Sequence, residues 1–187
     1  MKVNRHGKAA RLTAEEFAAL LAAAPSPRYR ALWAVQRWTA ARIGEALALH
    51  WADVAGAQVT YRRASTKTTR QVPQCEPLQQ ALVDYRQEWA REHGHAPTAA
   101  EALFPAAGST TSPQTRQAAD KALRKTCRQI RLEGVSLHSF RRSAAQDAVS
   151  RGLPLHVEQA LTGHKSLGSL GEYLSASRAE VLAAIGG

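Results

Sequence analysis

The chain has 187 residues, of which 44% are hydrophobic, and this suits one domain with a sizeable buried core. Lysine and arginine number 25 against 15 acidic residues, and the formal net charge of +10 favours a polyanionic partner such as nucleic acid. No run approaches the roughly 20 apolar residues of a membrane helix, the basic N-terminus lacks a signal peptide's apolar run, and two cysteines without a pairing motif fit a reducing, cytoplasmic compartment.

The N-terminal part of the chain predicts three helices. A capping box at Thr13 and Glu16 predicts a first helix, which ends at Pro25. A second helix is expected from about Arg28 to Thr39, and a short third helix starts near Arg42. Their expected buried residues recur at helical spacing: Phe17, Leu20 and Leu21, then Leu32, Val35 and Trp38, then Ile43, Ala46, Leu47 and Leu49.

The middle of the chain changes period. Residues 58–61 and 70–73 are short β-like runs on either side of a polar turn, and they predict a small antiparallel hairpin. A helix is expected from about Leu78 to Glu92. Residues 94–113 are rich in glycine, proline, alanine, serine and threonine, and they predict a long loop with one apolar anchor at Leu103–Phe104.

The C-terminal part returns to helices. Gly152 suits a helix C-cap, and Pro154 suits the first turn of the next helix. The expected helices cover residues 115–131, 139–151 and 155–161, followed by a short one with Tyr173 and another over 178–185. The fold class predicted from this pass is mainly α with a small antiparallel β-hairpin.

Positive charge gathers between Arg116 and Arg142, where the only acids are Asp120 and Glu133. Clustered basic residues of this kind favour contact with nucleic acid phosphates, although a basic protein without a special partner has the same composition. The residues that we expect to contact DNA are Arg116, Lys121, Arg124, Lys125, Arg128 and Arg142.

Several polar residues have an ordinary interpretation when each is taken singly. Arg42 fits a solvated arginine at a helix end, His138 a capping histidine, Arg141 a surface arginine, His164 a loop residue, Lys67 a solubilising turn residue and Tyr173 a half-buried packing residue.

Together these residue types suit attack on a phosphodiester. The attacked phosphorus becomes pentacoordinate, and its non-bridging oxygens gain negative charge that planar guanidinium groups can bind through paired donors. Imidazoles can donate hydrogen bonds to those oxygens or move a proton. A lysine can protonate the leaving alkoxide, and a tyrosine nucleophile stores the bond as a phosphodiester, so that rejoining needs no ATP.

From Leu12 onward the chain resembles the catalytic domain of the tyrosine recombinase (phage integrase) family. ARIGEALALHWADV resembles the motif in which an arginine, here Arg42, is followed three residues on by an acid, here Glu45. RRASTKTTRQVPQ resembles the hairpin of the family's catalytic lysine, which gives Lys67.

Two further segments complete the resemblance. LHSFRRSAAQDAVSRG resembles the His-x-x-Arg motif, which gives His138 and Arg141, and LTGHKSLGSLGEYL resembles the Gly-His segment and nucleophile, which gives His164 and Tyr173. His164 follows Arg141 by 23 positions (164 − 141) and precedes Tyr173 by 9 (173 − 164), and both intervals are typical of the family.

The resemblance implies a site-specific recombinase or integrase of a mobile genetic element. Tyr173 attacks the scissile phosphate, Arg42 and Arg141 bind its oxygens, and Lys67 protonates the leaving 5′ oxygen. His138 assists proton removal from the nucleophile, His164 hydrogen-bonds the phosphate, and Glu45 orients this set. The implied partner is double-stranded DNA, with a monomer free in solution and a tetramer on DNA, and no metal or other cofactor is implied.

The family pattern also sets the expected domain organisation. We expect residues 1–11 to be a basic arm or linker remnant and residues 12–187 to be the catalytic domain. The family usually carries a separate helical DNA-binding domain ahead of this one. The chain departs from the pattern at Arg142, where the family often has a second histidine, and at Gly44, where serine is common.

Two other functions use similar residues. A type IB topoisomerase has similar chemistry but only relaxes supercoils, and a catalytically silent relative would bind DNA through basic residues alone. A metal hydrolase built on His93 and His95 is disfavoured because no carboxylate or cysteine pair stands nearby at metal-ligand spacing. The sequence leaves open the DNA target and the choice between excision, integration and resolution.

Overall fold

The computed structural model describes residues 9–63 and 68–163. Its elements in chain order are α1 (Ala14–Ala22), α2 (Pro27–Trp38), α3 (Ile43–Leu47), the 3₁₀ helix η1 (Trp51–Val54), β1 (Gln58–Arg63), β2 (Thr68–Pro73), α4 (Glu76–His93), α5 (Arg116–Gln129), α6 (Leu137–Ser150) and α7 (Leu155–Thr162). The prediction of a mainly helical chain with one antiparallel hairpin is confirmed. No helix in the described part of the chain has both the length and the apolar character needed to cross a membrane.

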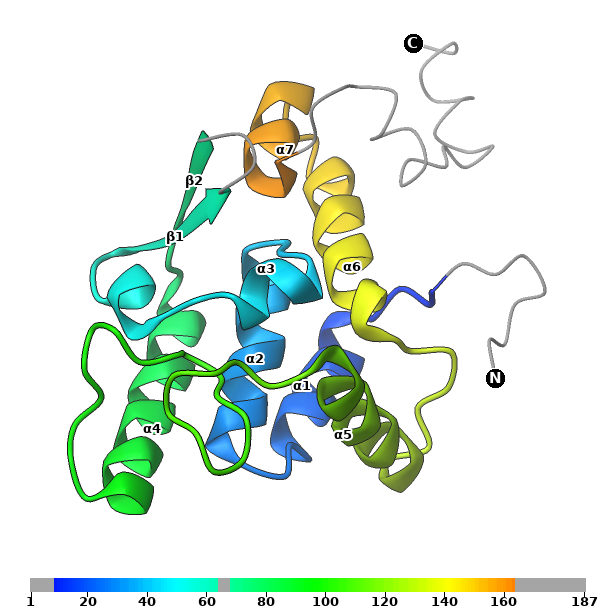
Figure 1. Ribbon diagram of the computed structural model, residues 1–187. Coiled ribbons are helices and arrows are strands. Elements are labelled where there is room, and N and C mark those ends of the chain that lie inside the picture. The colour runs from blue at the N-terminus through cyan, green and yellow to red at the C-terminus, as the bar shows by residue number, and fades with distance from the viewer. Residues whose placement is uncertain (1–8, 64–67, 164–187) are drawn as a thin grey trace, which may run out of the picture.

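Helix α2 forms the centre of the core. Residues 31–36 are all buried, including the polar Gln36, so this helix is covered on all sides rather than along one stripe. Helices α4 and α6 pack on either side of α2 (Figure 1). The amide of Gln36 donates to the Leu137 carbonyl at 3.2 Å, and this bond ties α2 to the start of α6.

Aromatic side chains fill the space between these helices. Phe17 packs edge-on against Trp38 at 5.3 Å and lies 6.2 Å from Phe140, so α1, α2 and α6 share one cluster. Trp38, expected to be buried, is only partly buried because it lies at the end of α2. A second cluster joins η1, α4 and the following loop through Trp51, Tyr85, Trp89 and Phe104.

The long loop predicted after α4 is present and well anchored. Leu103 and Phe104 are fully buried, as expected. The Tyr85 hydroxyl donates to the Leu103 carbonyl at 2.8 Å, and a bridge between His50 and Ala102 ties the loop to the chain before η1. The loop is thus part of the core despite its lack of regular structure.

Helices α5 and α6 end in the same hydrogen-bond pattern with different residues. After α6, Gly152 has φ +68, its N–H donates to the Val149 carbonyl, and the Leu153 N–H donates to the Ala148 carbonyl. This is a Schellman motif, and it confirms Gly152 as a helix terminator. After α5, Arg131 takes the glycine position with φ +55.

Helix α6 starts earlier than expected. The sequence predicted a start near Ser139, but the helix begins at Leu137. Ser136 is the N-cap, since its hydroxyl accepts from the His138 N–H while the Ser139 hydroxyl accepts from the Ser136 N–H. The earlier start places His138 inside the first turn.

Residues 9–12, which we call the N-terminal strap, are bound along α6. The Ala9 carbonyl accepts from Arg142 at 2.6 Å, and the Leu12 N–H donates to the Ser143 hydroxyl at 2.8 Å. Between them Arg11 pairs with Asp147 at 2.8 Å. The boundary between a basic arm and a domain at residue 12 stays a prediction, but residues 9–11 contact the domain as closely as Leu12 does.

Candidate active site

The turn between α2 and α3 is the framework of the site. Thr39 caps α2, and its hydroxyl donates to the Val35 carbonyl at 2.6 Å. The next residue, Ala40, is buried with φ +51, a left-handed conformation that costs a non-glycine residue roughly 1–2 kcal/mol. This backbone reversal separates α2 from α3 and places Arg42 at the N-cap of α3.

Arg42 and Glu45 form the first part of the site. The Glu45 carboxylate accepts from the backbone N–H of Arg42 at 2.9 Å and from its guanidinium at 3.2 Å. The Arg42 side chain stays 42% exposed, whereas Glu45 is 16% exposed. The Arg42 guanidinium is therefore accessible to a ligand, and the Glu45 carboxylate holds both the backbone and the side chain of Arg42 in place.

Arg141 reaches the same turn from α6. Its side chain is 2% exposed, and its Nη1 donates to the Ala40 carbonyl at 2.6 Å. The acceptor, Ala40, is two residues before Arg42. The structure therefore brings together the two arginines of the predicted site, which lie far apart in the sequence. The bond from Arg141 also holds the left-handed Ala40 in place.

His138 lies in the first turn of α6 but is exposed, unlike Arg141. Its Nε2 lies 3.2 Å from Nη2 of Arg116, at the start of α5. Because a guanidinium only donates, Nε2 is the acceptor in this contact. Arg116, predicted to contact DNA, thus lies against a predicted catalytic residue.

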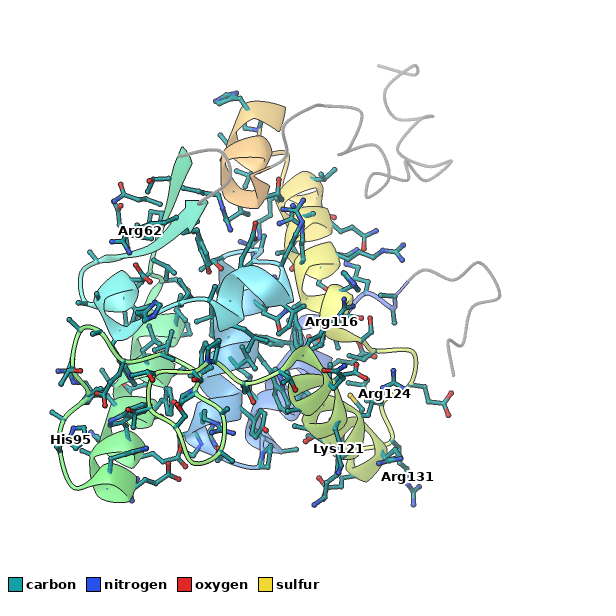
Figure 2. All side chains as sticks on the ribbon, viewed as in Figure 1. Arg62, His95, Arg116, Lys121, Arg124 and Arg131 are labelled. Atoms are coloured by element: carbon teal, nitrogen blue, oxygen red, sulfur yellow. The ribbon has the colours of Figure 1, made fainter. Side chains whose placement is uncertain are left out.

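The other basic residues of α5 lie on one side of the helix. At about 100° per residue, this side is opposite the buried Ala119 and Leu123. Its members are Lys121, Arg124, Lys125 and Arg128. Figure 2 shows Lys121 on the part of α5 that is farther from α6 than Arg116 is, and Arg131 just beyond the end of that helix. Arg124 is ion-paired with Asp120 at 2.6 Å.

Arg142, also predicted to contact DNA, binds the strap through the Ala9 carbonyl and is partly buried. A guanidinium carries five N–H donors, so this bond leaves the prediction of DNA contact open.

Sequence reasoning missed Arg70, which donates to Glu45 at 3.4 Å from β2. The sequence does contain a signal for Arg70, because side chains alternate between the two faces of a strand. Val72 points into the core, and Arg70, two positions away, lies on the same face, where a charged residue is unusual.

Three predicted catalytic residues, Lys67, His164 and Tyr173, lie outside the described residues. Lys67 immediately precedes β2, and His164 follows Gly163, which ends the described chain with φ +66.

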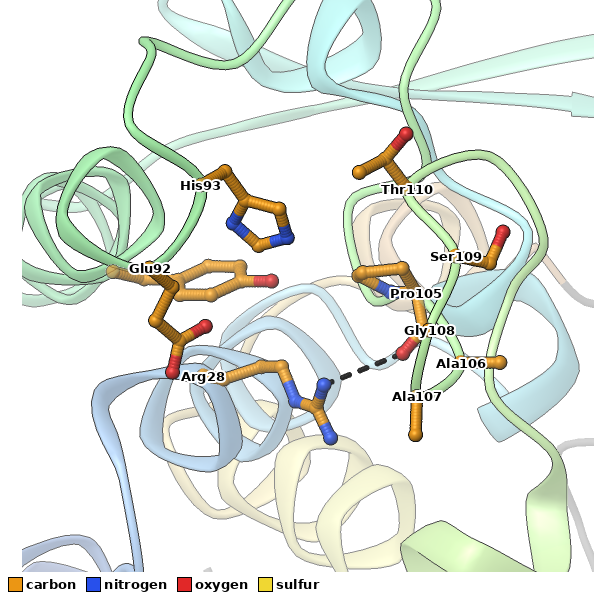
Figure 3. Close-up of a pocket in the computed structure, with 10 residues that line it drawn as sticks. Arg28, Glu92, His93, Pro105, Ala106, Ala107, Gly108, Ser109 and Thr110 are labelled. Atoms are coloured by element: carbon orange, nitrogen blue, oxygen red, sulfur yellow. Dashed lines mark hydrogen bonds between the residues drawn. The ribbon is translucent and has the colours of Figure 1, made fainter.

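The structure also has a cavity of about 490 Å³ between α4 and the loop over residues 105–110. Arg28, Tyr85, Glu92 and His93 line it, and Arg28 donates to the Pro105 carbonyl at 3.3 Å (Figure 3). Among the predicted catalytic residues that the structure describes, neither Arg42, His138 nor Arg141 lines it. Within the described ranges, no group of three or more histidine, cysteine or acidic side chains is arranged to hold a metal ion.

Comparisons with known proteins give one matching family and several similar solved structures. The model of the phage integrase family matches residues 10–180. The XerA recombinase structure superposes with a TM-score of 0.78 at 19% identity, covering 95% of this chain and 63% of that one. XerH recombinase, solved bound to its difH substrate, gives a TM-score of 0.73 at 23% identity and covers 95% of this chain and 53% of that one.

A lambda integrase dimer bound to a COC′ core site gives a TM-score of 0.66 at 19% identity, with 88% of this chain and 47% of that one covered. The chain therefore spans roughly half to two thirds of these proteins. At such identities the likeness shows a shared fold, that of the tyrosine recombinase catalytic domain. A comparison with curated proteins gave no match.

Proposed function

Because the chain belongs to the phage integrase family, we propose that it is a site-specific DNA recombinase that cleaves and rejoins strands through a 3′-phosphotyrosyl link on Tyr173. The observation that carries this proposal is the convergence of Arg42 and Arg141 on one turn. Two guanidinium groups beside one phosphate would neutralise the charge that its non-bridging oxygens gain during attack. No bound metal is needed for that role.

The nucleophile is assigned partly by elimination among the four tyrosines. Tyr61 and Tyr85 are buried, their hydroxyls are engaged with Thr39 and the Leu103 carbonyl, and burial raises the pKa of both phenols. Tyr29 lies at the far end of α2, about 14 Å along the helix axis from the end that precedes Arg42. Tyr173 is the tyrosine that remains.

The proposed reaction conserves the number of phosphoester bonds. The Tyr173 oxygen forms a bond to phosphorus as His138 assists removal of its proton, and the bond from phosphorus to the 5′ oxygen breaks. The electron pair stays on that oxygen, which takes a proton from Lys67, while His164 donates to the phosphate. The 5′-hydroxyl of a partner strand then reverses the attack and releases Tyr173.

The proposed partner is double-stranded DNA. Several relatives with the same fold were solved with DNA, including the Tn1549 transposon integrase with transposon right end DNA. We assign phosphate contacts to Arg116, Lys121, Arg124, Lys125, Arg128 and Arg142. The protein acts in the cytoplasm, is a monomer without DNA and assembles as a tetramer on its recombination site.

The test is trapping of the covalent adduct. A pool of nicked suicide duplexes with a randomised core, incubated with the protein, should yield a protein–DNA band on a denaturing gel, because the released end diffuses away. Tyr173→Phe should bind the pool but form no adduct. The adduct should persist in excess EDTA, since the arginines supply the positive charge.

Mapping of the adduct to another tyrosine would overturn the nucleophile, and loss of the adduct on chelation with recovery in magnesium would overturn the charge assignment. Recovered target sequences then allow a two-site recombination assay. Relaxation of supercoils without exchange between two sites would indicate a type IB topoisomerase instead.

A further inference from the structure

Arg70 occupies an unusual position for an arginine. It lies on β2 opposite Tyr61 of β1, its side chain is 14% exposed, and its guanidinium lies 4.3 Å from the centre of the Tyr61 ring. Tyr61 is itself held by its hydroxyl against that of Thr39 at 2.6 Å. Stacking on a fixed ring limits the orientations open to the guanidinium.

The guanidinium connects three separate segments. Nη1 donates to the Thr39 carbonyl at 2.9 Å, at the turn between α2 and α3, and also to the Leu161 carbonyl near the end of α7. Nη2 donates to the Glu45 carboxylate in α3 at 3.4 Å. A lysine carries its donors on one nitrogen and lacks the planar fork that aims Nη1 and Nη2 at different acceptors.

These contacts reach the site through Glu45. The oxygen that accepts from Arg70 also accepts from the backbone N–H of Arg42, and the other oxygen accepts from the Arg42 guanidinium. Arg70 therefore sets the position of the carboxylate that orients Arg42. The Leu161 bond fixes the end of α7 against the same turn.

From this geometry we infer that Arg70 is a positioning residue for the phosphate site. It touches no reacting atom, and it holds β2, the α2–α3 turn, Glu45 and the end of α7 in one arrangement. The inference rests on the proposed function for its catalytic consequence but not for its structural one.

The test compares Arg70→Met and Arg70→Lys with Arg62→Met. Arg62 is one strand away, 65% exposed and ion-paired with Asp53, so it controls for loss of charge on the hairpin. Adduct formation is measured at saturating DNA on two duplexes. One carries a normal scissile phosphate, and the other a methylphosphonate, whose uncharged phosphorus centre depends less on arginine.

We expect Arg70→Met to slow adduct formation on the phosphate roughly 100-fold, the effect of a displacement of about 1 Å at a catalytic group. Arg70→Lys should fall between Arg70→Met and the wild type, and Arg62→Met should match the wild type. On the methylphosphonate the loss should largely disappear. A phosphate rate within twofold of the wild type, or an equal loss on both duplexes, would overturn the positioning role.

Hydrogen–deuterium exchange tests the arrangement without any reaction. Arg70→Met should raise exchange in residues 39–45 and 155–162 while α4 stays protected, and Arg70→Lys should do so more weakly. Unchanged exchange in those segments, or a rise across the whole molecule, would refute the inference. If the wild type forms no adduct, the proposed function fails, and exchange alone decides the role of Arg70.

Discussion

Tyr61 and Tyr85 are buried phenols, and they make the stability of the fold depend on pH. Burial raises the pKa of both phenols above the ordinary value, most strongly through loss of hydration of the charged form. The unfolded chain releases these protons near pH 10 and the folded chain does not. The two buried, protonated phenols therefore contribute fully to the free energy of unfolding below about pH 10, and this contribution is lost as pH rises beyond that value.

We predict that the free energy of unfolding falls steeply above about pH 10. Tyr85→Phe should reduce this dependence, because it removes one proton that only the unfolded chain releases. Tyr29→Phe is the control, because Tyr29 is less buried. Urea unfolding at pH 8 and at higher pH, followed by tryptophan fluorescence, measures the effect. An identical pH dependence in Tyr85→Phe and wild type would contradict it.

Residue-scale features differ in how far the sequence predicts them. The capping box of Thr13 and Glu16 is entirely local, so the spacing of the two residues is enough to predict it, and both of its hydrogen bonds form. Arg42 and Arg141 were found through family motifs, not through physics alone. The left-handed Ala40 and the bridging Arg70 were missed, because each depends on partners far away in the sequence.

Arg131 and Gly152 occupy the same left-handed position after α5 and α6, so they allow an arginine and a glycine to be compared at one type of helix end. A non-glycine residue in the left-handed region is strained, whereas glycine is not. We predict that Arg131→Gly raises the free energy of unfolding by about 0.5–1 kcal/mol, after allowance for the greater freedom of glycine in the unfolded chain. Gly152→Ala should lower it by about 1 kcal/mol.

An added Cβ at Gly152 meets no atom within 4 Å, so the cost there is conformational. Gly56→Ala is the matched control, because the site is equally open and its φ is not positive. Urea denaturation of the three variants gives the comparison. Destabilisation by Arg131→Gly would show that the arginine side chain outweighs its backbone strain.

Asp147 ties the N-terminal strap to the core through Arg11 and Arg37. Partial burial disfavours its charged form, but the hydrogen bond from Arg11 and the charge of Arg37 outweigh burial and hold the pKa below its ordinary value. The stabilisation of the fold by the charged Asp147 carboxylate is present above the unfolded pKa of about 3.9, and it is lost as pH falls through the lower pKa of the folded chain.

Asp147→Asn should therefore lower the free energy of unfolding at pH 7 by about 1 kcal/mol, and the difference from wild type should vanish in acid. Asp84→Asn is the control, since Asp84 makes a long 3.8 Å ion pair with Arg30 and accepts from the neutral amide of Gln80, so this change removes a carboxylate without a short ion pair. Urea unfolding at both pH values checks this. A difference that persists in acid would mean that Asp147 acts through packing rather than charge.

For the whole molecule, the basic side of α5 predicts how salt affects DNA binding. Removal of one side chain that neutralises a phosphate should reduce the slope of log affinity against log salt by about 0.9. Lys121→Gln with Arg128→Gln should therefore reduce it by about 1.8, equally on specific and scrambled duplexes. Arg86→Gln with Arg91→Gln removes the same charge from exposed positions on α4 as a control.

Fluorescence anisotropy at several salt concentrations measures these slopes. Equal slopes for the two double variants would mean that α5 contributes only to net charge. A weakening confined to the specific duplex would mean that the α5 side chains read bases.

The bond from Arg141 to Ala40 also determines when the site can form during synthesis. The two residues are 101 positions apart. At about 5–20 residues per second, a ribosome needs roughly 5–20 s to reach Arg141 after Ala40. Until then the left-handed turn lacks the donor that holds it, even though α2 has already emerged. We expect a nascent chain to complete the phosphate site only when α6 docks, since Arg141 is one of its two arginines and also holds the Ala40 turn.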